Sequence, residues 1–250
     1  MLPVLIIIPL IIAVAIYMVS VKDGRQQVCD NYVLIAYLYA LFYICLTAYI
    51  TMMIFLNLHN ILNYLFTKDF NTYMYIAIVV AICIAYIALF MITIILPKKF
   101  VLVKHVLSLF VMLFGSILLA IIFFTYAPDA IFVALIMTIL LFIVLTIIAW
   151  KFQDYISSNI SIVFVIVFLI LIAMELILLV FFPNSMVTSI IIFVVLLALC
   201  YILLIRTKII IENSKTCKEE QPPDYVSEGL GLYLSFKNLL LQILQLRSRR

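Results

Sequence analysis

The most constraining feature of the sequence is a succession of apolar stretches, each about as long as a bilayer is thick. A helix needs roughly 20 mostly apolar residues to cross the hydrocarbon core. Seven stretches meet that requirement, at residues 2–21, 32–56, 72–96, 101–126, 130–150, 160–182 and 186–205, and a weaker eighth covers 226–246. Only helices satisfy their own backbone hydrogen bonds in lipid without closing a barrel. The sequence therefore predicts an all-α polytopic membrane protein.

Composition and chain punctuation agree with this prediction. The chain is 69% hydrophobic and only 10% charged, an excess that no soluble core could bury. Pro97, Pro128 and Pro183 fall between the apolar stretches, where a missing N–H group costs least. The sequence has no G-x-S-x-G, H-E-x-x-H or phosphate-binding glycine pattern. We therefore expect no enzyme activity, no cofactor and no nucleic-acid partner, with the lipid bilayer as the main surroundings.

The basic residues predict an orientation. The chain has 15 Lys and Arg, and all except Lys68 fall on one side if the eighth segment returns to the side where it starts. That side should be cytosolic. Residues 1–21 lack a charged start and are expected to form an uncleaved anchor, with a cleaved signal peptide as the alternative. Residues 22–250 would form one transmembrane domain. The sequon at 159–161 would lie in the cytosol, unused.

Cysteine, histidine and loop aspartates suggest no further chemistry. The five cysteines show no C-x-x-C spacing, so we expect reduced thiols and no disulfide framework; they are Cys29, Cys45, Cys83, Cys200 and Cys217. His59 and His105 have no Cys or carboxylate at ligand spacing, so we expect no metal site. Asp129 and Asp154 fall in loops on opposite sides of the predicted membrane and cannot form a catalytic pair.

The last segment carries a polar stripe. Its polar or small residues recur at intervals of three and four, which places them on one helical face; they are Glu228, Gly231, Ser235, Asn238, Gln242 and Gln245. One interpretation is a central helix whose stripe faces a cavity or pathway inside a bundle. The other is an amphipathic helix lying on the cytosolic leaflet, anchored by Arg247, Arg249 and Arg250. Lys237 lies off the stripe, which favours the surface helix slightly, although a lysine can snorkel.

The same segment resembles the closing motif of the Bax inhibitor/Lifeguard (transmembrane Bax inhibitor motif) family. That motif reads roughly D/E-Y-x-x-x-x-L-x-L-Y-L-D-I-I-N-L, and the residues here that carry the resemblance include Asp224, Tyr225, Tyr233, Leu234 and Asn238. Upstream, residues 203–208, which contain Thr207, are similar to the family's I-I-Y-D-T-Q, and 152–155 are similar to its F-x-T-K-x-D-F loop. The resemblance covers about residues 30 to 246. It implies a six-helix bundle around a central seventh helix, with the N-terminal hydrophobic segment as an addition.

Two departures from the family pattern affect function. The resemblance implies a buried pair of aspartates associated with proton-sensitive calcium leak, because two close carboxylates in a low dielectric cannot both ionise. Arg206 and Ser235 stand at those two positions, and neither is an acid near neutral pH. Such loss is familiar in divergent, virus-encoded relatives. The resemblance thus implies the fold but not the pH-gated leak. Arg206 is expected to be a snorkelling anchor, with a plug in place of the lost aspartate as the alternative.

The expected function is modulation of cell death and stress from an internal membrane, such as the endoplasmic reticulum or Golgi. Calcium ions and other membrane proteins are the implied partners. Glu175 is the only acidic residue deep inside a clear span, which makes it a functional candidate. It is expected to pair with Arg206 or Lys237 or to line a pathway, unless it is protonated beside a local partner. The candidate pathway or gating residues are Glu175, Arg206, Ser235, Asn238 and Gln242. The alternatives are a small ion channel or transporter and a seven-span receptor-like protein.

Overall fold

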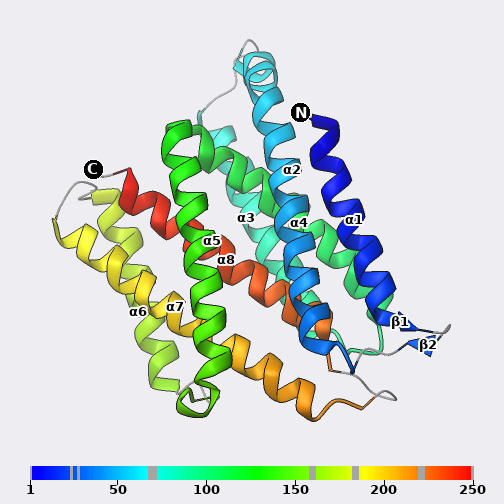
Figure 1. Ribbon diagram of the computed structural model, residues 1–250. Helices are drawn as coiled ribbons and strands as arrows, with labels where there is room; N and C mark the ends of the chain where they lie inside the picture. The colour runs from blue at the N-terminus through cyan, green and yellow to red at the C-terminus, as the bar shows by residue number, and fades with distance from the viewer. Residues whose placement is uncertain are drawn as a thin grey trace. The chain divides into compact units, whose positions relative to one another are not determined.

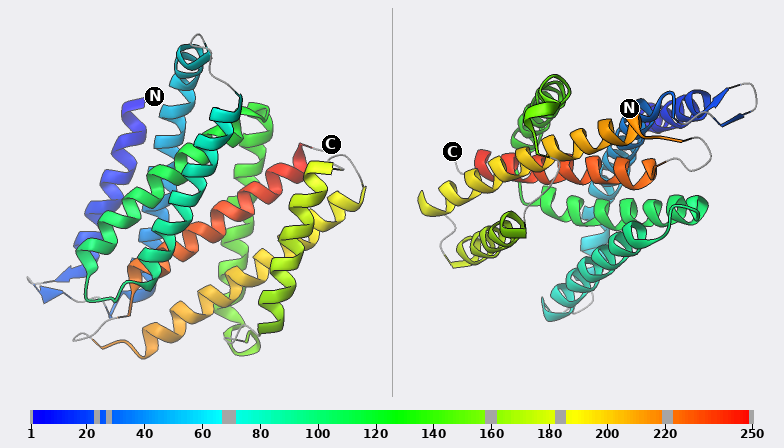
Figure 2. Two further views of the ribbon diagram at one scale, coloured as in Figure 1. Left: turned by 180° about the vertical axis from the view of Figure 1, so that it is seen from behind. Right: turned by 90° about the horizontal axis from the view of Figure 1, so that it is seen from below.

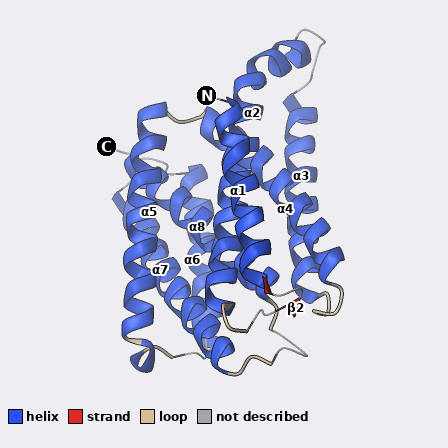
Figure 3. Cartoon of the chain, turned by 45° about the vertical axis from the view of Figure 1, so that its right-hand side comes forward, coloured by secondary structure: helices blue, strands red, loops and turns tan. Residues whose placement is uncertain are grey.

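The computed structural model describes residues 2–22, 25–26, 29–66, 72–157, 162–181, 186–218 and 223–248. These residues are almost entirely helical (Figure 3). Their helices are α1 (Leu2–Ser20), α2 (Tyr32–Phe66), α3 (Thr72–Ile95), α4 (Val101–Phe124), α5 (Pro128–Lys151), α6 (Ile162–Phe181), α7 (Met186–Lys215) and α8 (Tyr225–Arg247). The short strands β1 (Val21–Lys22) and β2 (Arg25–Gln26) pair antiparallel, and a 3₁₀ turn, η1, covers Gln153–Tyr155. All eight predicted segments are therefore helices.

Five helical segments in the described part of the chain are long and apolar enough to cross a membrane. They are Tyr32–Asn57, Ala77–Ile95, Val101–Phe124, Pro128–Lys151 and Met186–Lys215. Ile7–Val19 and Phe164–Glu175 are shorter apolar segments. Many large apolar side chains on these helices are exposed, as they should be on a surface whose solvent is lipid. The predicted class, an all-α polytopic membrane protein, is confirmed.

Two helices extend beyond their apolar stretches. α2 continues past residue 56 to Phe66, and α7 continues past residue 205 to Lys215. The predicted limits stop where polar or charged residues begin, at Asn57 and Arg206. Helical hydrogen bonds form within the segment itself and do not need lipid around them. Hydropathy therefore marks where a helix could leave the membrane and not where the helix ends.

The chain forms two compact units, which Figures 1 and 2 allow the reader to follow along the sequence. The first unit comprises Met1–Tyr126 and Lys218–Leu230, and the second comprises Ala127–Cys217 and Gly231–Arg250. In the first unit α2 packs between α1 and α4, and α3 packs on α4. In the second, α7 packs on α5 and α6. The first turns of α8, up to Leu230, belong to the first unit, and the remainder of the helix belongs to the second.

In the first unit, α2 and α4 are joined by a ladder of polar side chains. Its rungs pair Tyr39 with His105, Tyr43 with Ser108, Thr47 with Met112, and Thr51 with Ser116. At the last rungs the Thr51 hydroxyl donates to the Ser116 carbonyl oxygen, and the Ser116 hydroxyl lies 3.4 Å from the Thr47 carbonyl oxygen. Short hydroxyl side chains that reach a neighbouring backbone are typical of close helix packing in membranes.

Helix α8 is enclosed along its length. Only Arg247 among its 23 residues is exposed. Ser235 is 4% exposed and Lys237 is 7% exposed, although the two lie on different faces of the helix. A helix lying on a leaflet surface would leave one whole face in water. The surface-helix interpretation is therefore wrong, and the interpretation of an interior helix holds.

Two contacts locate the part of α8 that belongs to the second unit. Near its start Gly231 lies against Arg206, in the second half of α7. Near its end Gln242 bonds to Glu175, in the second half of α6. The side of the membrane on which Arg247 lies stays a prediction.

The cysteines divide into two groups. Cys45, Cys83 and Cys200, all within helices, are free thiols as predicted. Cys29 and Cys217 are disulfide-bonded, so the expectation of reduced thiols is wrong for these two. A disulfide depends on the separation of the two residues in the fold, and spacing along the sequence carries no record of it.

The remaining predictions stay predictions. The sequon at 159–161 and the side chain of His59 lie outside the described residues, as do Arg249 and Arg250. The division into an anchor at 1–21 and a domain at 22–250 stays a prediction, as does the cytosolic orientation.

Candidate functional site

In the first unit, Asp224 organises the start of α8. Its Oδ1 accepts the backbone N–H of Ser227 at 3.2 Å, and its Oδ2 accepts the Ser227 hydroxyl at 2.8 Å. This is the geometry of a helix N-cap. Lys104 of α4 donates to the same carboxylate and, at 3.0 Å, to the Ser227 hydroxyl oxygen. The Lys104 side chain is 1% exposed, so a buried cation lies at this helix start and is neutralised there.

Tyr225, the first residue of α8, belongs to the same contact. Its ring centroid is 5.4 Å from that of Tyr39, whose ring in turn stacks on His105 at 5.4 Å. Gly229 lies closer still to α2, because a Cβ atom there would be 2.6 Å from the Tyr39 Cβ and 3.1 Å from the Ala36 carbonyl oxygen. Only glycine permits this approach of α8 to α2.

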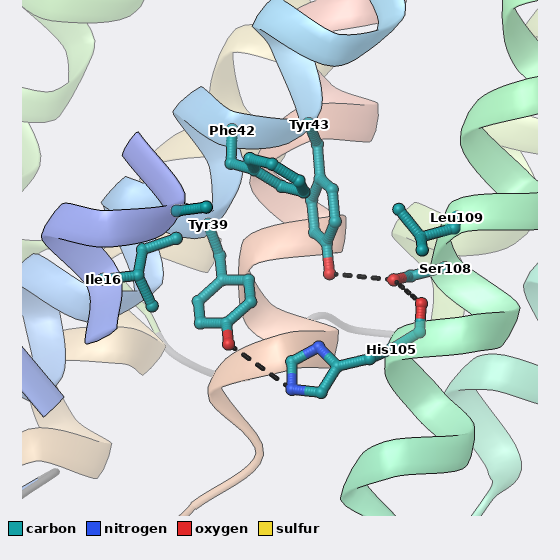
Figure 4. Close-up of a pocket in the computed structure, with 8 residues that line it drawn as sticks. Ile16, Tyr39, Phe42, Tyr43, His105, Ser108 and Leu109 are labelled. Carbon is teal, nitrogen blue, oxygen red and sulfur yellow. Dashed lines mark hydrogen bonds between the residues drawn. The ribbon is translucent and has the colours of Figure 1, made fainter. Parts of the chain in front are cut away.

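A cavity of about 260 Å³ lies beside this contact, between α1, α2 and α4 (Figure 4). Its lining residues are Ala13, Ile16, Tyr39, Phe42, Tyr43, His105, Ser108 and Leu109. The Tyr39 hydroxyl lies 3.4 Å from the His105 Nε2, and the Tyr43 hydroxyl donates to Ser108 at 3.1 Å. Ser108 in turn donates to the His105 carbonyl oxygen at 2.8 Å. The wall is thus largely aromatic, and its hydroxyls bond to other residues of the lining.

In the second unit, Arg206 and Ser235 lie near one another on α7 and α8. A Cβ atom at Gly231 would overlap the Arg206 guanidinium, so this arginine packs directly on the α8 backbone. Ser235 follows one turn later, and its hydroxyl donates to the Gly231 carbonyl oxygen at 3.0 Å. Within the described residues Arg206 makes no ion pair. The two positions that the resemblance gives to acids therefore carry a cation and a hydroxyl at one helix–helix contact.

Glu175 makes a separate contact with α8. Its side chain is 4% exposed, and the Gln242 amide nitrogen donates to both carboxylate oxygens, at 2.9 and 3.1 Å. Gln242 lies two turns beyond Ser235, about 10 Å along the helix. The predicted partner Arg206 is not bonded to Glu175 among the described residues, because it lies against Gly231 instead. The structure thus joins Glu175 and Gln242 and keeps them apart from the contact between Arg206 and the turn that carries Ser235.

The remaining predicted residues surround these contacts. Thr207 and Tyr233 are each 2% exposed, and Leu234 and Asn238 are half-buried. Phe236 packs edge-on against Phe142 of α5, with ring centroids 5.7 Å apart. These residues support the α8 helix in the second unit.

The two weaker family-like motifs meet at the end of α5. Lys208, at the close of the 203–208 motif, donates to the Ile156 carbonyl oxygen just after η1. Lys215 donates to the Gln153 side-chain oxygen at 2.9 Å. Asp129 and Asp154 lie at opposite ends of α5, about 36 Å apart by helix length, and so do not form a pair.

Sequence reasoning named Asp224 and Tyr225 but missed the residues that they contact in the first unit. Lys104 was expected only to set orientation, and His105 was considered only as a metal ligand. One signal was available: an Asp immediately before a helical pattern, followed three residues later by a Ser, is typical of an N-cap. Nothing in the sequence indicates that Lys104 reaches that cap.

Comparison with known proteins agrees with the resemblance. The family model described as "Inhibitor of apoptosis-promoting Bax1" matches residues 24–250. No curated protein and no solved structure matches the chain. Because the family model covers nearly the whole chain, the protein belongs to this Bax inhibitor family. Membership indicates a multi-pass membrane protein that modulates cell death. α1 precedes the matched residues.

Proposed function

We propose that the protein modulates cell death from an internal membrane by binding or regulating other membrane proteins, and that it alters calcium handling through them. It acts without catalysing a reaction and without pH-gated conduction of its own. The observation that carries this proposal is the contact of Arg206 with α8. A permanently charged guanidinium packs on Gly231, one turn from Ser235. No proton-binding pair can operate at that contact, because an arginine does not deprotonate in proteins.

Residence in the endoplasmic reticulum or Golgi and a viral origin belong to the same proposal. Family membership supports the first, and the absence of the acidic pair fits the second.

The direct test is to restore the acids. The double variant Arg206→Asp with Ser235→Asp should gain a calcium leak that changes with pH in proteoliposomes, whereas the native protein should show none. Arg206→Leu with Ser235→Ala is the matched control, because it removes the cation without adding carboxylates. A pH-dependent leak from the native protein would refute the proposal.

The partner-binding part is tested in cells. Cells that express the native protein should survive a Bax-dependent death stimulus better than control cells. Calcium release from the endoplasmic reticulum should also change in these cells, but only when the membrane partners are present. Equal survival with and without the protein would remove the basis for a role in cell death.

A further inference from the structure

The cavity between α1, α2 and α4 is a site that the proposed function does not use (Figure 4). All of the residues that line it belong to the first unit. Two of them, Ala13 and Ile16, come from α1, which precedes the residues that the family model matches. Family membership therefore does not account for this cavity.

The polar end of the cavity lies near the ends of the helices that line it. α2 and α4 run in the same direction, because successive rungs of the ladder between them advance along both helices. Tyr39 lies about 10 Å along the apolar segment that begins at Tyr32, and His105 lies about 6 Å from the start of α4. Phe42 and Leu109 follow about one turn deeper. The phenol hydroxyl and the imidazole thus lie near the membrane interface, with apolar side chains further in.

The rim of the cavity faces the surroundings of the helices. Ala13 and Leu109 are exposed, whereas Ile16 and Tyr43 are buried at the inner wall. Exposed apolar side chains on such helices have lipid as their solvent, so a lipid has a lateral path into the cavity. The volume of about 260 Å³ is slightly below the roughly 300–1,000 Å³ that encloses a drug-sized ligand. The cavity therefore holds one end of a lipid and leaves the rest in the bilayer.

The polar end offers neutral hydrogen-bonding groups. The Ser108 hydroxyl accepts from Tyr43 and donates to the His105 carbonyl oxygen, so it is engaged in both directions. The Tyr39 hydroxyl and the His105 Nε2 are 3.4 Å apart, longer than an ordinary hydrogen bond (Figure 4). A ligand hydroxyl beside them can accept from Tyr39 and donate to Nε2, which replaces one long contact with two ordinary bonds.

The lining does not suit an anionic lipid headgroup. Among the described residues that line the cavity there is no Lys, Arg, Asp or Glu. The neighbouring cation, Lys104, is already bonded to Asp224 and Ser227. A phosphate or carboxylate group would thus lie in largely apolar surroundings without a counter-charge, which is unfavourable. The aromatic walls instead present flat apolar faces to a rigid body.

We propose that the cavity binds a sterol, with the sterol hydroxyl between Tyr39 and His105 and the fused rings against Phe42 and Leu109. A sterol in a bilayer has its hydroxyl near the interface and its rings and tail deeper, which is the order of polar and apolar lining in the cavity. A sterol is also neutral, rigid and apolar except at this one hydroxyl. The proposal does not depend on the proposed function, because none of the lining residues is a candidate gating residue.

The experiment is photolabelling of the purified full-length protein, in phosphatidylcholine nanodiscs, by a cholesterol analogue that carries a diazirine in its ring system. Labelling should be saturable, and mass spectrometry should place the label on α1, α2 or α4. Unlabelled cholesterol should compete. Its 3α epimer has the same apolar body but a differently directed hydroxyl, so it should compete about 3- to 10-fold less well through loss of a hydrogen bond.

Substitutions test the two ends of the cavity separately. Tyr39→Phe removes only the hydroxyl, so it should weaken cholesterol binding by about 3- to 10-fold and narrow the difference between the epimers. Ala13→Phe fills the rim and should abolish the labelling that cholesterol displaces. Val14→Phe is the matched control, because it adds the same side chain at the next position of α1, which is 56% exposed and is not part of the lining. Its labelling should equal that of the native protein.

Other outcomes would overturn the proposal. Labelling that cholesterol does not displace, or a label confined to α5, α6 and α7, would remove the site. Equal labelling of Ala13→Phe and Val14→Phe would show that the sterol binds elsewhere. Equal competition by the two epimers would show that the hydroxyl is not recognised, and it does so in the native protein, where no substitution disturbs the ladder between α2 and α4. Stronger competition by oleate than by cholesterol would reassign the cavity to a fatty acid.

Discussion

The two ends of α8 differ in how completely their buried polar groups are bonded. At the start, in the first unit, Lys104 is met by the Asp224 carboxylate, and both bond to Ser227. Near the end, in the second unit, Glu175 is held by the neutral Gln242 amide, and two amide oxygens accept no bond from the described residues. A cluster with opposite charges and mutual hydrogen bonds stabilises a helix end. A cluster whose acceptors are only partly bonded contributes less, because each unbonded buried oxygen costs free energy. The difference indicates that the first end of α8 contributes more to stability than the second.

The largest expected effect is at the structural end. Asp224→Ala should lower the free energy of unfolding by about 3–5 kcal/mol, because it leaves the Lys104 ammonium buried without a counter-charge. Thermal unfolding in detergent, compared with the native protein, measures this effect. The double variant Lys104→Met with Asp224→Asn should recover much of the lost stability, since both charges are then gone. If the double variant is no more stable than Asp224→Ala, the ion pair between Lys104 and Asp224 does not stabilise the start of α8.

The next largest effect is expected at the two glycines of α8, which should differ in how much stability is lost when each is replaced by alanine. Gly229→Ala should lower the free energy of unfolding by about 1–3 kcal/mol, because its Cβ would meet the Tyr39 Cβ and the Ala36 carbonyl oxygen, which cannot move aside freely. Gly231→Ala should change it by less than about 1 kcal/mol, because the end of the flexible Arg206 side chain can shift and alanine favours a helix. Equilibrium unfolding of the two variants side by side checks the order. A larger loss from Gly231→Ala would mean that Arg206 is fixed in its place.

At the other end of α8 a substitution should stabilise the fold. Gln245→Leu should raise the free energy of unfolding by about 1 kcal/mol, because it removes a buried oxygen that accepts no hydrogen bond. Gln242→Leu is the control, and it should be destabilising by about 1–3 kcal/mol, since it deprives Glu175 of its amide donor. Unfolding midpoints of the two variants, each compared with the native protein, distinguish these effects. Destabilisation by Gln245→Leu would contradict the account of a surplus acceptor.

The smallest effect is expected at the exposed bond between α7 and η1. Lys215→Ala should change the free energy of unfolding by less than about 0.5 kcal/mol, because an exposed hydrogen bond to Gln153 exchanges readily with water. The same thermal unfolding assay applies. A loss above 1 kcal/mol would assign this loop a structural role comparable to that of Asp224.

Much of the fold could be predicted from the sequence, for a simple physical reason. In lipid the backbone must bond to itself, so length and hydropathy alone identify the helices. What these properties omit is the continuation of α2 to Phe66 and of α7 to Lys215, since a helix can extend into water. The enclosure of α8 was left open by its pattern, because a polar stripe fits both a surface helix and an interior one.

The sequence predicted which residues belong to the candidate site, but it did not predict which residues they bond to. Glu175 and Gln242 both stood out as polar groups in apolar surroundings, but pairing depends on how α6 and α8 pack, and no sequence spacing records that. Charge complementarity alone suggests Arg206 or Lys237 as the partner of Glu175. The structure shows that the Gln242 amide bonds to Glu175. Lys104 was missed because one lysine near the start of a span looks the same whether it snorkels or is buried.

The ladder between α2 and α4 has a consequence for the shape of the first unit. Its rungs are graded in size, from Tyr39 and Tyr43 at one end to Thr47 and Thr51 at the other. At the threonine end short side chains make the contacts, to the Met112 sulfur and the Ser116 carbonyl oxygen. At the tyrosine end long side chains reach His105 and Ser108. The cavity lined by Tyr39, Tyr43 and His105 therefore lies at the end of the ladder where the long side chains make the rungs.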